Sequence, residues 1–192
     1  MKSPQALGAC CIVLAAGESS RMGRPKQLLE LDGKPLFTYA LNTALEVCEE
    51  VVLVQGAVDL SGYLPPAGNL KLLTNRDWHR GMLGSLQTGL ARCRHTRIFV
   101  IPADLPMVQA ATYRHLAGAQ GTAPAAFPVC NGRRGHPVLL GPEAVSLINA
   151  ADPELKAMKV IAPLDPLAVE VTDSGIYRDI DTPEEWERLK GE

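Results

Sequence analysis

The sequence predicts an α/β protein of three layers, in which a mostly parallel twisted sheet carries helices on both faces. Strand-like and helix-like segments alternate along the 192 residues, which is the pattern of such folds. Apolar runs such as 51–54 are continuous, as expected of strands that are buried on both faces. A chain of this length can bury a substantial core, so we expect one domain over residues 1–192.

The expected elements follow in a regular order. Strands are predicted at 10–14, 51–54, 70–73, 98–101 and 169–171, and two more within 125–140 around a hairpin or tight loop at 132–135. Helices are predicted from Pro35 to 45, from 84 to 93 with Ser85 as part of the cap, at 110–119 and at 142–150. A last helix is predicted at 183–190, because Thr182 is a suitable N-cap, Pro183 suits the first helical position and Glu185 completes a capping box.

Composition excludes several classes of function. The formal net charge is −2, so a general nucleic-acid binder is not expected. No apolar run approaches the roughly 20 residues of a membrane span, and no convincing secretory signal precedes the basic residues of the first loop. We therefore expect a cytoplasmic protein with neither a nucleic-acid nor a membrane partner.

The five cysteines do not form a metal or redox motif. Their number is odd, no C-x-x-C pair occurs, and three lie in or beside apolar runs. Reduced, buried thiols are the expectation. The four histidines lack the spacing of zinc ligands.

The loop of residues 14–26 is the strongest functional signal. It follows the first predicted strand, and its small residues and glycines let the backbone approach a ligand closely. Arg21 and Lys26 bring two cations to the same loop. A glycine-bearing basic loop after a strand is how many α/β proteins hold phosphate.

Acidic residues at other strand ends complete this signal. Asp104 follows the strand at 98–101, and Asp181 precedes the last helix. Ligands bind at the carboxyl ends of strands in open α/β sheets, so these carboxylates and the basic loop are expected to meet there. A polyphosphate bound to the basic loop, with Mg²⁺ held by Asp104, would balance the positive and negative charges that meet there. Alternatively, Arg21 and Lys26 form a solvated loop, and Asp104, Asp179 and Asp181 are turn or capping residues.

Two common phosphate motifs are absent from the sequence. It contains no G-x-x-x-x-G-K-[ST], and the run 17–23 does not match G-x-G-x-x-G. A Walker-type NTPase is thereby excluded, and a dinucleotide-dependent dehydrogenase would be supported only by the alternation of strands and helices.

Five blocks of sequence together resemble nucleotidyltransferases of the molybdopterin guanylyl- and cytidylyltransferase type. They are residues 14–26, the Asn75–Gly89 block with Trp78, Gly81 and Ser85, the Pro102–Pro106 block, 132–138, and 179–184. The resemblance implies a Rossmann-like nucleotidyltransferase fold with a nucleotide-binding N-terminal part and an acceptor-binding C-terminal part.

The resemblance also implies the nucleotide. Guanylyltransferases usually read Leu-Ala-Gly-Gly, whereas this chain reads Leu14-Ala15-Ala16-Gly17, as in the cytidylyltransferases. CTP is therefore the expected substrate. The hypothesis is that the Ala16 methyl narrows the space beside the base.

The implied reaction is transfer of CMP from CTP to the terminal phosphate of molybdenum-molybdopterin, with release of pyrophosphate. The implied catalytic residues are Arg21 and Lys26, which would neutralise the β- and γ-phosphates, and Asp104, which would bind Mg²⁺ with Asp181 as second ligand. The implied substrate-binding residues are Leu14, Ala15, Ala16, Gly17 and Ser85 for the nucleotide and Arg134 and His136 for the acceptor. A structural role for His136 and a packing role for Trp78 are the alternatives.

The chain departs from the family pattern at two places, of which the first is expected to help bind the acceptor. The family often reads Gly-Asp-x-Gly-Ala-Arg where this chain has Ala150–Ala157, with Lys156 near the usual arginine, and Leu83 stands where a small residue is commoner. A different nucleotide or phosphorylated acceptor, such as GTP or a sugar phosphate, therefore remains an alternative. So does a non-catalytic delivery factor for a molybdenum hydroxylase apoenzyme, which is also a candidate partner of the enzyme.

Overall fold

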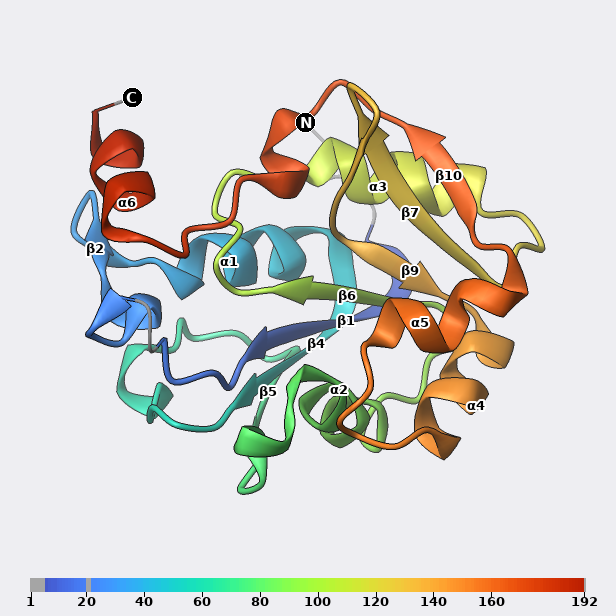
Figure 1. Cartoon of the computed structure of the whole chain (residues 1–192), viewed down its shortest axis with the longest axis horizontal. Helices are drawn as coiled ribbons and strands as arrows, with labels where there is room; N and C mark the ends of the chain where they lie inside the picture. The colour runs from blue at the N-terminus through green and yellow to red at the C-terminus, as the bar shows by residue number, and fades with distance from the viewer. Residues whose placement is uncertain (1–5, 20–21, 192) are drawn as a thin grey trace.

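A computed structural model describes residues 6–19 and 22–191. Its main sheet has the strand order β10-β7-β9-β6-β1-β4-β5, and β8 pairs with β7 (Figure 1). The strands are β1 (Leu7–Ala15), β4 (Cys48–Gln55), β5 (Leu70–Thr74), β6 (Ile98–Pro102), β7 (Ala125–Cys130), β8 (Arg133–Arg134), β9 (Val138–Leu140) and β10 (Leu167–Glu170). A separate hairpin joins β2 (Glu30–Leu31) and β3 (Lys34–Pro35).

Helices cover both faces of the sheet, as the sequence predicts. They are α1 (Phe37–Val47), α2 (Met82–Leu90), α3 (Ala110–Ala119), α4 (Pro142–Ala150), α5 (Ala157–Ile161) and α6 (Pro183–Lys190). Successive residues of β1 point to opposite faces: Val13 packs in a cluster with α1 and α3, and Ile12 packs in one with α2, α4 and α5. The α/β class of three layers is thus confirmed.

Parallel pairing brings three strand ends to the same level. Leu14 of β1 stands opposite Val54 of β4 on one side and Pro102 of β6 on the other. The Ala103 N–H donates to the Leu14 carbonyl at 2.9 Å and extends this alignment beyond the strands. In the main strand path only β9 is reversed, pairing antiparallel with β6 and β7. The segments after β1 and β6 therefore begin side by side.

The C-terminal helix packs against the N-terminal loop region rather than on the main sheet. Buried Trp186 and Leu189 of α6 share an apolar cluster with Met22 and Leu36, and Ile180 belongs to it as well. Figure 1 shows α6 beside β2. This cluster fixes the last 15 or so residues relative to the loop that follows β1.

Most predicted elements are present, with corrections at their ends. The helices at 110–119 and 142–150 are correct, and Thr182 and Glu185 form the predicted capping box of α6. The first helix begins at Phe37, because Pro35 pairs in β3 instead. Helix α2 begins at Met82, so Ser85 lies inside it and is not a cap. The short helix α5 was not predicted.

The thiol prediction is correct for three cysteines and wrong for two. Cys11, Cys48 and Cys130 are free and buried. Cys10 and Cys93 are joined by a disulfide between β1 and the segment after α2, with Cα atoms 6.4 Å apart. The sequence separation of 83 residues hides this proximity. Among the described helices, none is long and apolar enough to cross a membrane.

Candidate functional site

Lys26 lies between two carboxylates at the carboxyl edge of the sheet. Its Nζ donates to Asp104 Oδ2 and, at 2.5 Å, to Asp181 Oδ1. The three side chains come from the loop after β1, the end of β6 and the segment before α6, and each is about one-fifth exposed or less. The structure therefore brings together three of the predicted site residues, which are as far as 155 positions apart in the sequence.

The two carboxylates keep Lys26 charged. Burial alone would lower the pKa of the Lys26 ammonium, but the charges of Asp104 and Asp181 and the hydrogen bonds to them outweigh burial and raise it. Because the pKa is raised, the stabilising contribution of this ammonium is complete at neutral pH and is lost only as the pH rises through the alkaline range. Lys26 is thus a fixed cation in a site that also carries fixed anions.

One carboxylate oxygen of the site is available to bind a cation. Asp104 Oδ1 is buried and has no hydrogen-bond partner, which is an arrangement that proteins rarely leave unexplained. Burial raises the pKa of the neighbouring Asp179 carboxyl, and the charges of Asp104 and Asp181 raise it further. Carboxylate oxygens are the ligands that Mg²⁺ prefers, so the donor set fits that ion. Among the described residues, however, no group of three or more acidic, histidine or cysteine side chains forms a complete metal site.

The loop after β1 is held by a buried glutamine that the sequence analysis missed. Gln27 Nε2 donates to the Gly17 carbonyl at 2.6 Å and to the Ala15 carbonyl at 3.3 Å, while Ser19 Oγ donates to Gln27 Oε1. The Lys26 N–H in turn donates to Ser19 Oγ. These bonds tie Lys26 and Gln27 to residues 15–19 and so position Lys26. The signal in the sequence that could have identified Gln27 is a polar residue directly after Lys26 and before an apolar pair. The predicted catalytic residue Arg21 lies outside the described residues.

Ala16 contacts a second missed residue, Gly56. A Cβ atom built on Gly56 would lie 2.6 Å from the Ala16 carbonyl oxygen and 2.9 Å from the Ala16 Cβ, with Trp78 Cβ at 2.7 Å. The Ala57 N–H also donates to the Ala16 carbonyl at 3.0 Å. Any side chain at Gly56 would therefore displace the loop. The Ala16 methyl is buried against the segment that follows β4, and Trp78 packs at the same point.

Ser85 is buried within α2 and bonded to the protein. Its hydroxyl accepts a hydrogen bond from Asn75 Nδ2 at 3.0 Å, and both residues are almost fully buried. Asn75 Oδ1 accepts the N–H of Asp77, and the Asn75 N–H donates to the Gln55 carbonyl. The described contacts of Ser85 thus connect α2 to the turn after β5.

The predicted acceptor residues lie across from Lys26. A cavity of 480 Å³ is lined by Lys26, Asp104, Arg134 and His136, among others. Arg134 is exposed and its guanidinium lies 4.5 Å from the centre of the Phe127 ring. His136 is partly buried, and its Nδ1 lies 3.4 Å from the Val100 carbonyl oxygen. A smaller cavity, of 110 Å³, joins Lys26 and Asp104 to Leu14, Ala15 and Gly17.

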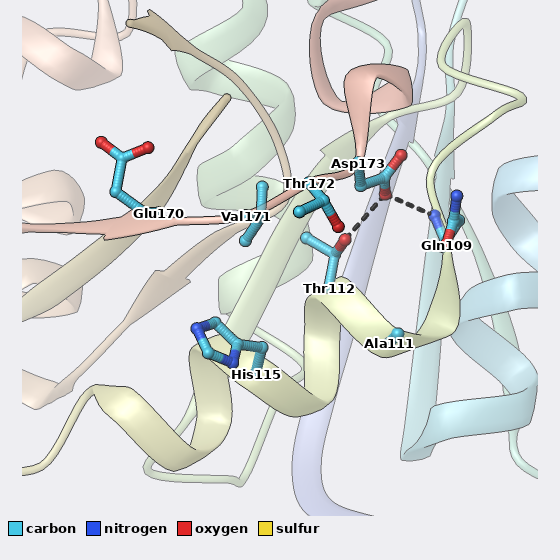
Figure 2. Close-up of a pocket in the computed structure, with 8 residues that line it drawn as sticks. All are labelled: Gln109, Ala111, Thr112, His115, Glu170, Val171, Thr172 and Asp173. Atoms are coloured by element: carbon cyan, nitrogen blue, oxygen red, sulfur yellow. Dashed lines mark hydrogen bonds between the residues drawn. The ribbon is translucent and has the colours of Figure 1, made fainter. Parts of the chain in front are cut away.

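A further hollow, between α3 and the segment after β10, is built around a structural aspartate (Figure 2). Asp173 is 6% exposed and accepts hydrogen bonds from the Gln109 N–H, the Thr112 hydroxyl and the Gly175 N–H. Figure 2 shows the first two bonds joining Asp173 to the start of α3. Because these bonds satisfy the carboxylate, Asp173 anchors the segment that leads to Asp179 and Asp181.

The fold and the site define an α/β protein that gathers a cation, carboxylates and a glycine loop at one sheet edge. The sequence profile of the MobA-like NTP transferase domain matches residues 11–168. The chain therefore belongs to the MobA-like NTP transferase family, as the five blocks had indicated.

Individual relatives agree with this family and differ in nucleotide. The chain is 26% identical over 178 residues to the molybdenum cofactor cytidylyltransferase of Escherichia coli K12, covering 92% of each chain. It is 29% identical over 193 residues to the molybdenum cofactor guanylyltransferase of Xanthomonas euvesicatoria, covering 93% of this chain and 92% of the relative. The crystal structure of Rv0371c from Mycobacterium tuberculosis H37Rv has the same fold, with a TM-score of 0.82, 22% identity and coverage of 98% and 100%.

Proposed function

We propose that the protein is a cytidylyltransferase that moves CMP from CTP to the terminal phosphate of molybdenum-molybdopterin. The observation that carries the proposal is Lys26 held between Asp104 and Asp181 beside the glycine loop. A delivery factor would need to bind its cargo, but it would not need a buried cation between two carboxylates. The cytidylyltransferase and guanylyltransferase relatives support the reaction class, but they differ in nucleotide. The choice of CTP therefore rests on Ala16.

The reaction forms one bond and breaks one. An oxygen of the acceptor phosphate attacks the α-phosphorus of CTP, the bond from that phosphorus to the bridging oxygen breaks, and pyrophosphate leaves. The acceptor is already anionic, so no strong general base is needed; the protein must hold two anions in line. Lys26 and Arg21 would neutralise the β- and γ-phosphates, while Arg134 and His136 would orient the acceptor.

Mg²⁺ fits the carboxylate side of this site. Asp104 would hold it through the buried oxygen that lacks a partner, and Asp181 would be its second ligand. When bound, the ion would supply positive charge to the phosphate oxygens. Lys26 would then exchange its contacts with the two carboxylates for contacts with phosphates.

A pyrophosphate-release assay tests the proposal. Molybdopterin would be supplied with CTP, GTP or ATP, with and without Mg²⁺, and activity is expected with CTP and Mg²⁺. Asp104→Ala should abolish turnover and Lys26→Ala should reduce it by roughly 10²-fold or more. Lys71→Ala is the matched control, because it removes a lysine that contacts Glu50 on the surface. Normal turnover in Asp104→Ala would reject the site.

The nucleotide preference has its own test. Ala16→Gly is expected to shift the ratio of CTP to GTP turnover toward GTP, because the loop that loses the methyl packed at Gly56 can move closer to Gly56 and leave more room beside the base. An unchanged ratio would mean that Ala16 does not set the choice of base.

A further inference from the structure

A disulfide joins the first strand of the sheet to the segment that follows α2. It links Cys10 of β1 with Cys93, and their Cα atoms lie 6.4 Å apart, within the usual range for cysteines that can be bridged. The Cys10 N–H also donates to the Arg97 carbonyl at 3.1 Å. Gly89 of α2 packs on β1 so closely that a Cβ there would lie 2.7 Å from Ile12 Cγ2. Backbone and packing contacts therefore hold the two cysteines next to each other independently of the bond between them.

The two cysteines of this pair differ in their access to solvent. Cys10 is fully buried in β1, whereas Cys93 is partly exposed. Cys11, Cys48 and Cys130 are free and buried, and burial raises the pKa of the Cys11 thiol well above its ordinary value. Buried cysteines in apolar surroundings are unreactive. Of the five cysteines, all of which the structure describes, Cys93 is therefore the one that a reagent in solution can reach.

Positive charge flanks Cys93 on both sides. Arg92 and Arg94 are its neighbours in the sequence, and both are exposed. Glu50, whose carboxylate lies 3.5 Å from His95 of the same segment, also contacts a lysine of β5. Exposed arginines attract anions from solution. The surroundings of Cys93 therefore favour the approach of an anionic disulfide such as glutathione disulfide.

We propose that Cys10 and Cys93 form a reversible thiol–disulfide site, at which Cys93 reacts with a small anionic disulfide and Cys10 resolves the adduct. One pair beside three free thiols differs from the framework of a protein stabilised by permanent disulfides. It fits the transient disulfides by which proteins of reducing compartments respond to oxidation. The site is separate from the proposed function, because Met82 at the start of α2 lines the cavity of Lys26 and Cys93 lies beyond the other end of that helix.

The exchange at this site takes place in two steps. The Cys93 sulfur attacks one sulfur of glutathione disulfide, the S–S bond of the reagent breaks, and one glutathione leaves with the proton that the Cys93 thiol has lost. The Cys10 sulfur then attacks the Cys93 sulfur, and the second glutathione leaves with the proton of the Cys10 thiol. The cysteine pair thereby loses two electrons, and glutathione disulfide gains them as it becomes two glutathione molecules.

The test exposes the reduced full-length protein to glutathione disulfide and identifies the products by intact mass and peptide mapping. The wild type is expected to form the Cys10–Cys93 disulfide without a lasting glutathione adduct, and dithiothreitol should restore both thiols. Cys10→Ala should keep one glutathione on Cys93, because the sulfur that resolves the adduct is missing. Cys93→Ser should form neither product. Cys130→Ala is the matched control, since it removes a buried cysteine outside the pair, and it should react as the wild type does.

The role of the flanking arginines has a separate measurement. The double variant with Arg92→Ala and Arg94→Ala is expected to react with glutathione disulfide at least about threefold more slowly than the wild type. Its rate with 2-hydroxyethyl disulfide, which carries no charge, should be unchanged. Equal slowing with both reagents would mean that the arginines do not attract the reagent by their charge.

Thermal unfolding gives a readout that does not depend on the buried variant Cys10→Ala. Because the bond closes a loop between residues 83 positions apart, the oxidised wild type is expected to melt at least about 5 °C above the reduced wild type. Cys93→Ser should melt at the same temperature with and without dithiothreitol. A wild type that keeps glutathione on Cys93, that reacts at another cysteine instead, or that melts equally in both states would overturn the proposal.

Discussion

At the scale of single residues, the candidate site depends on the positions of one lysine and two aspartates. Lys26 is a strong sequence signal, but its contacts with Asp104 and Asp181 could not be read from spacing, because they join segments 78 and 155 residues apart. Gln27 and Gly56 were missed because their roles depend on backbone atoms of the Ala15–Gly17 run, which no side-chain pattern records. The rule that ligands bind at strand ends predicted that these residues lie at the same edge of the sheet. Their individual contacts became visible only in the structure.

We expect His136 to make the stability of the protein sensitive to acid. Burial lowers the pKa of its imidazole, outweighing the opposite influence of the Val100 carbonyl and of Asp104. A histidine with a lowered pKa stabilises the fold fully above its ordinary pKa of about 6.5, and this stability is lost as the pH falls toward the lowered value. The melting temperature of the wild type is therefore expected to fall between pH 7.5 and pH 5, and that of His136→Gln should fall less.

The matched control is His115→Gln, on the exposed surface of α3. It should reproduce the pH dependence of the wild type. Equal falls in melting temperature for the wild type and His136→Gln would show that this imidazole does not carry the acid sensitivity.

At the scale of elements, three segments around the site are joined by backbone contacts. The His136 N–H donates to the Ile176 carbonyl at 2.8 Å, and the Ile180 N–H donates to the Asp104 carbonyl at 3.0 Å. Gly175 packs so closely on Met107 that a Cβ there would lie 2.3 Å from the Met107 carbonyl oxygen. The segments that carry His136, Asp104 and Asp181 are therefore held together by backbone contacts.

Gly135→Ala tests this joining of segments. A Cβ at Gly135 would lie 2.3 Å from the Ile176 carbonyl oxygen, and backbone atoms cannot move aside as a flexible side chain can. We expect a loss of about 1–3 kcal/mol in the free energy of unfolding, measured in urea, together with reduced pyrophosphate release.

Gly118→Ala provides the control for this substitution. Gly118 lies within α3, and a Cβ there would meet nothing within 4 Å. The alanine should be neutral or stabilise the protein by about 1 kcal/mol, because alanine favours helix. Wild-type stability and activity in Gly135→Ala would mean that the 133–136 and 174–177 segments can separate without consequence.

Prediction from sequence was most accurate where local signals were complete. The cap of α6 combines Thr182, Pro183 and Glu185 within four residues, and the helix was predicted correctly. Helix α5 has only five residues and no side-chain cap, so its formation depends on the contacts of Met158 and Ile161 with the core. The reversed direction of β9, a strand of three residues, could not be predicted, because the side-chain pattern of a strand is the same in either direction.

At the scale of the whole molecule, α6 near the C-terminus packs against the N-terminal loop region. Trp186 is 4% exposed and shares a cluster with Met22 of the loop after β1, with Leu36 and with Ile180, which precedes Asp181. Trp186→Ala is expected to cost about 3–5 kcal/mol of stability. It should also speed hydrogen exchange in residues 22–36, measured by mass spectrometry, because that region loses its cover.

Tyr63→Ala is the control, since Tyr63 is an aromatic side chain that is 50% exposed. Its stability and exchange should match those of the wild type. Unchanged exchange at residues 22–36 in Trp186→Ala would show that α6 does not support the loop.

The contact between Lys26 and Asp181 has a consequence for synthesis. A ribosome makes Lys26 and Asp104 before it makes Asp181 and α6, because the contact joins residues 155 positions apart. The contact of Lys26 with Asp181 can form only once residues 181–190 have left the exit tunnel, because α6 fixes that carboxylate. Until then, of the two carboxylates, Lys26 has only Asp104 as a partner, so we expect the charged cluster to be completed after the sheet that supports it.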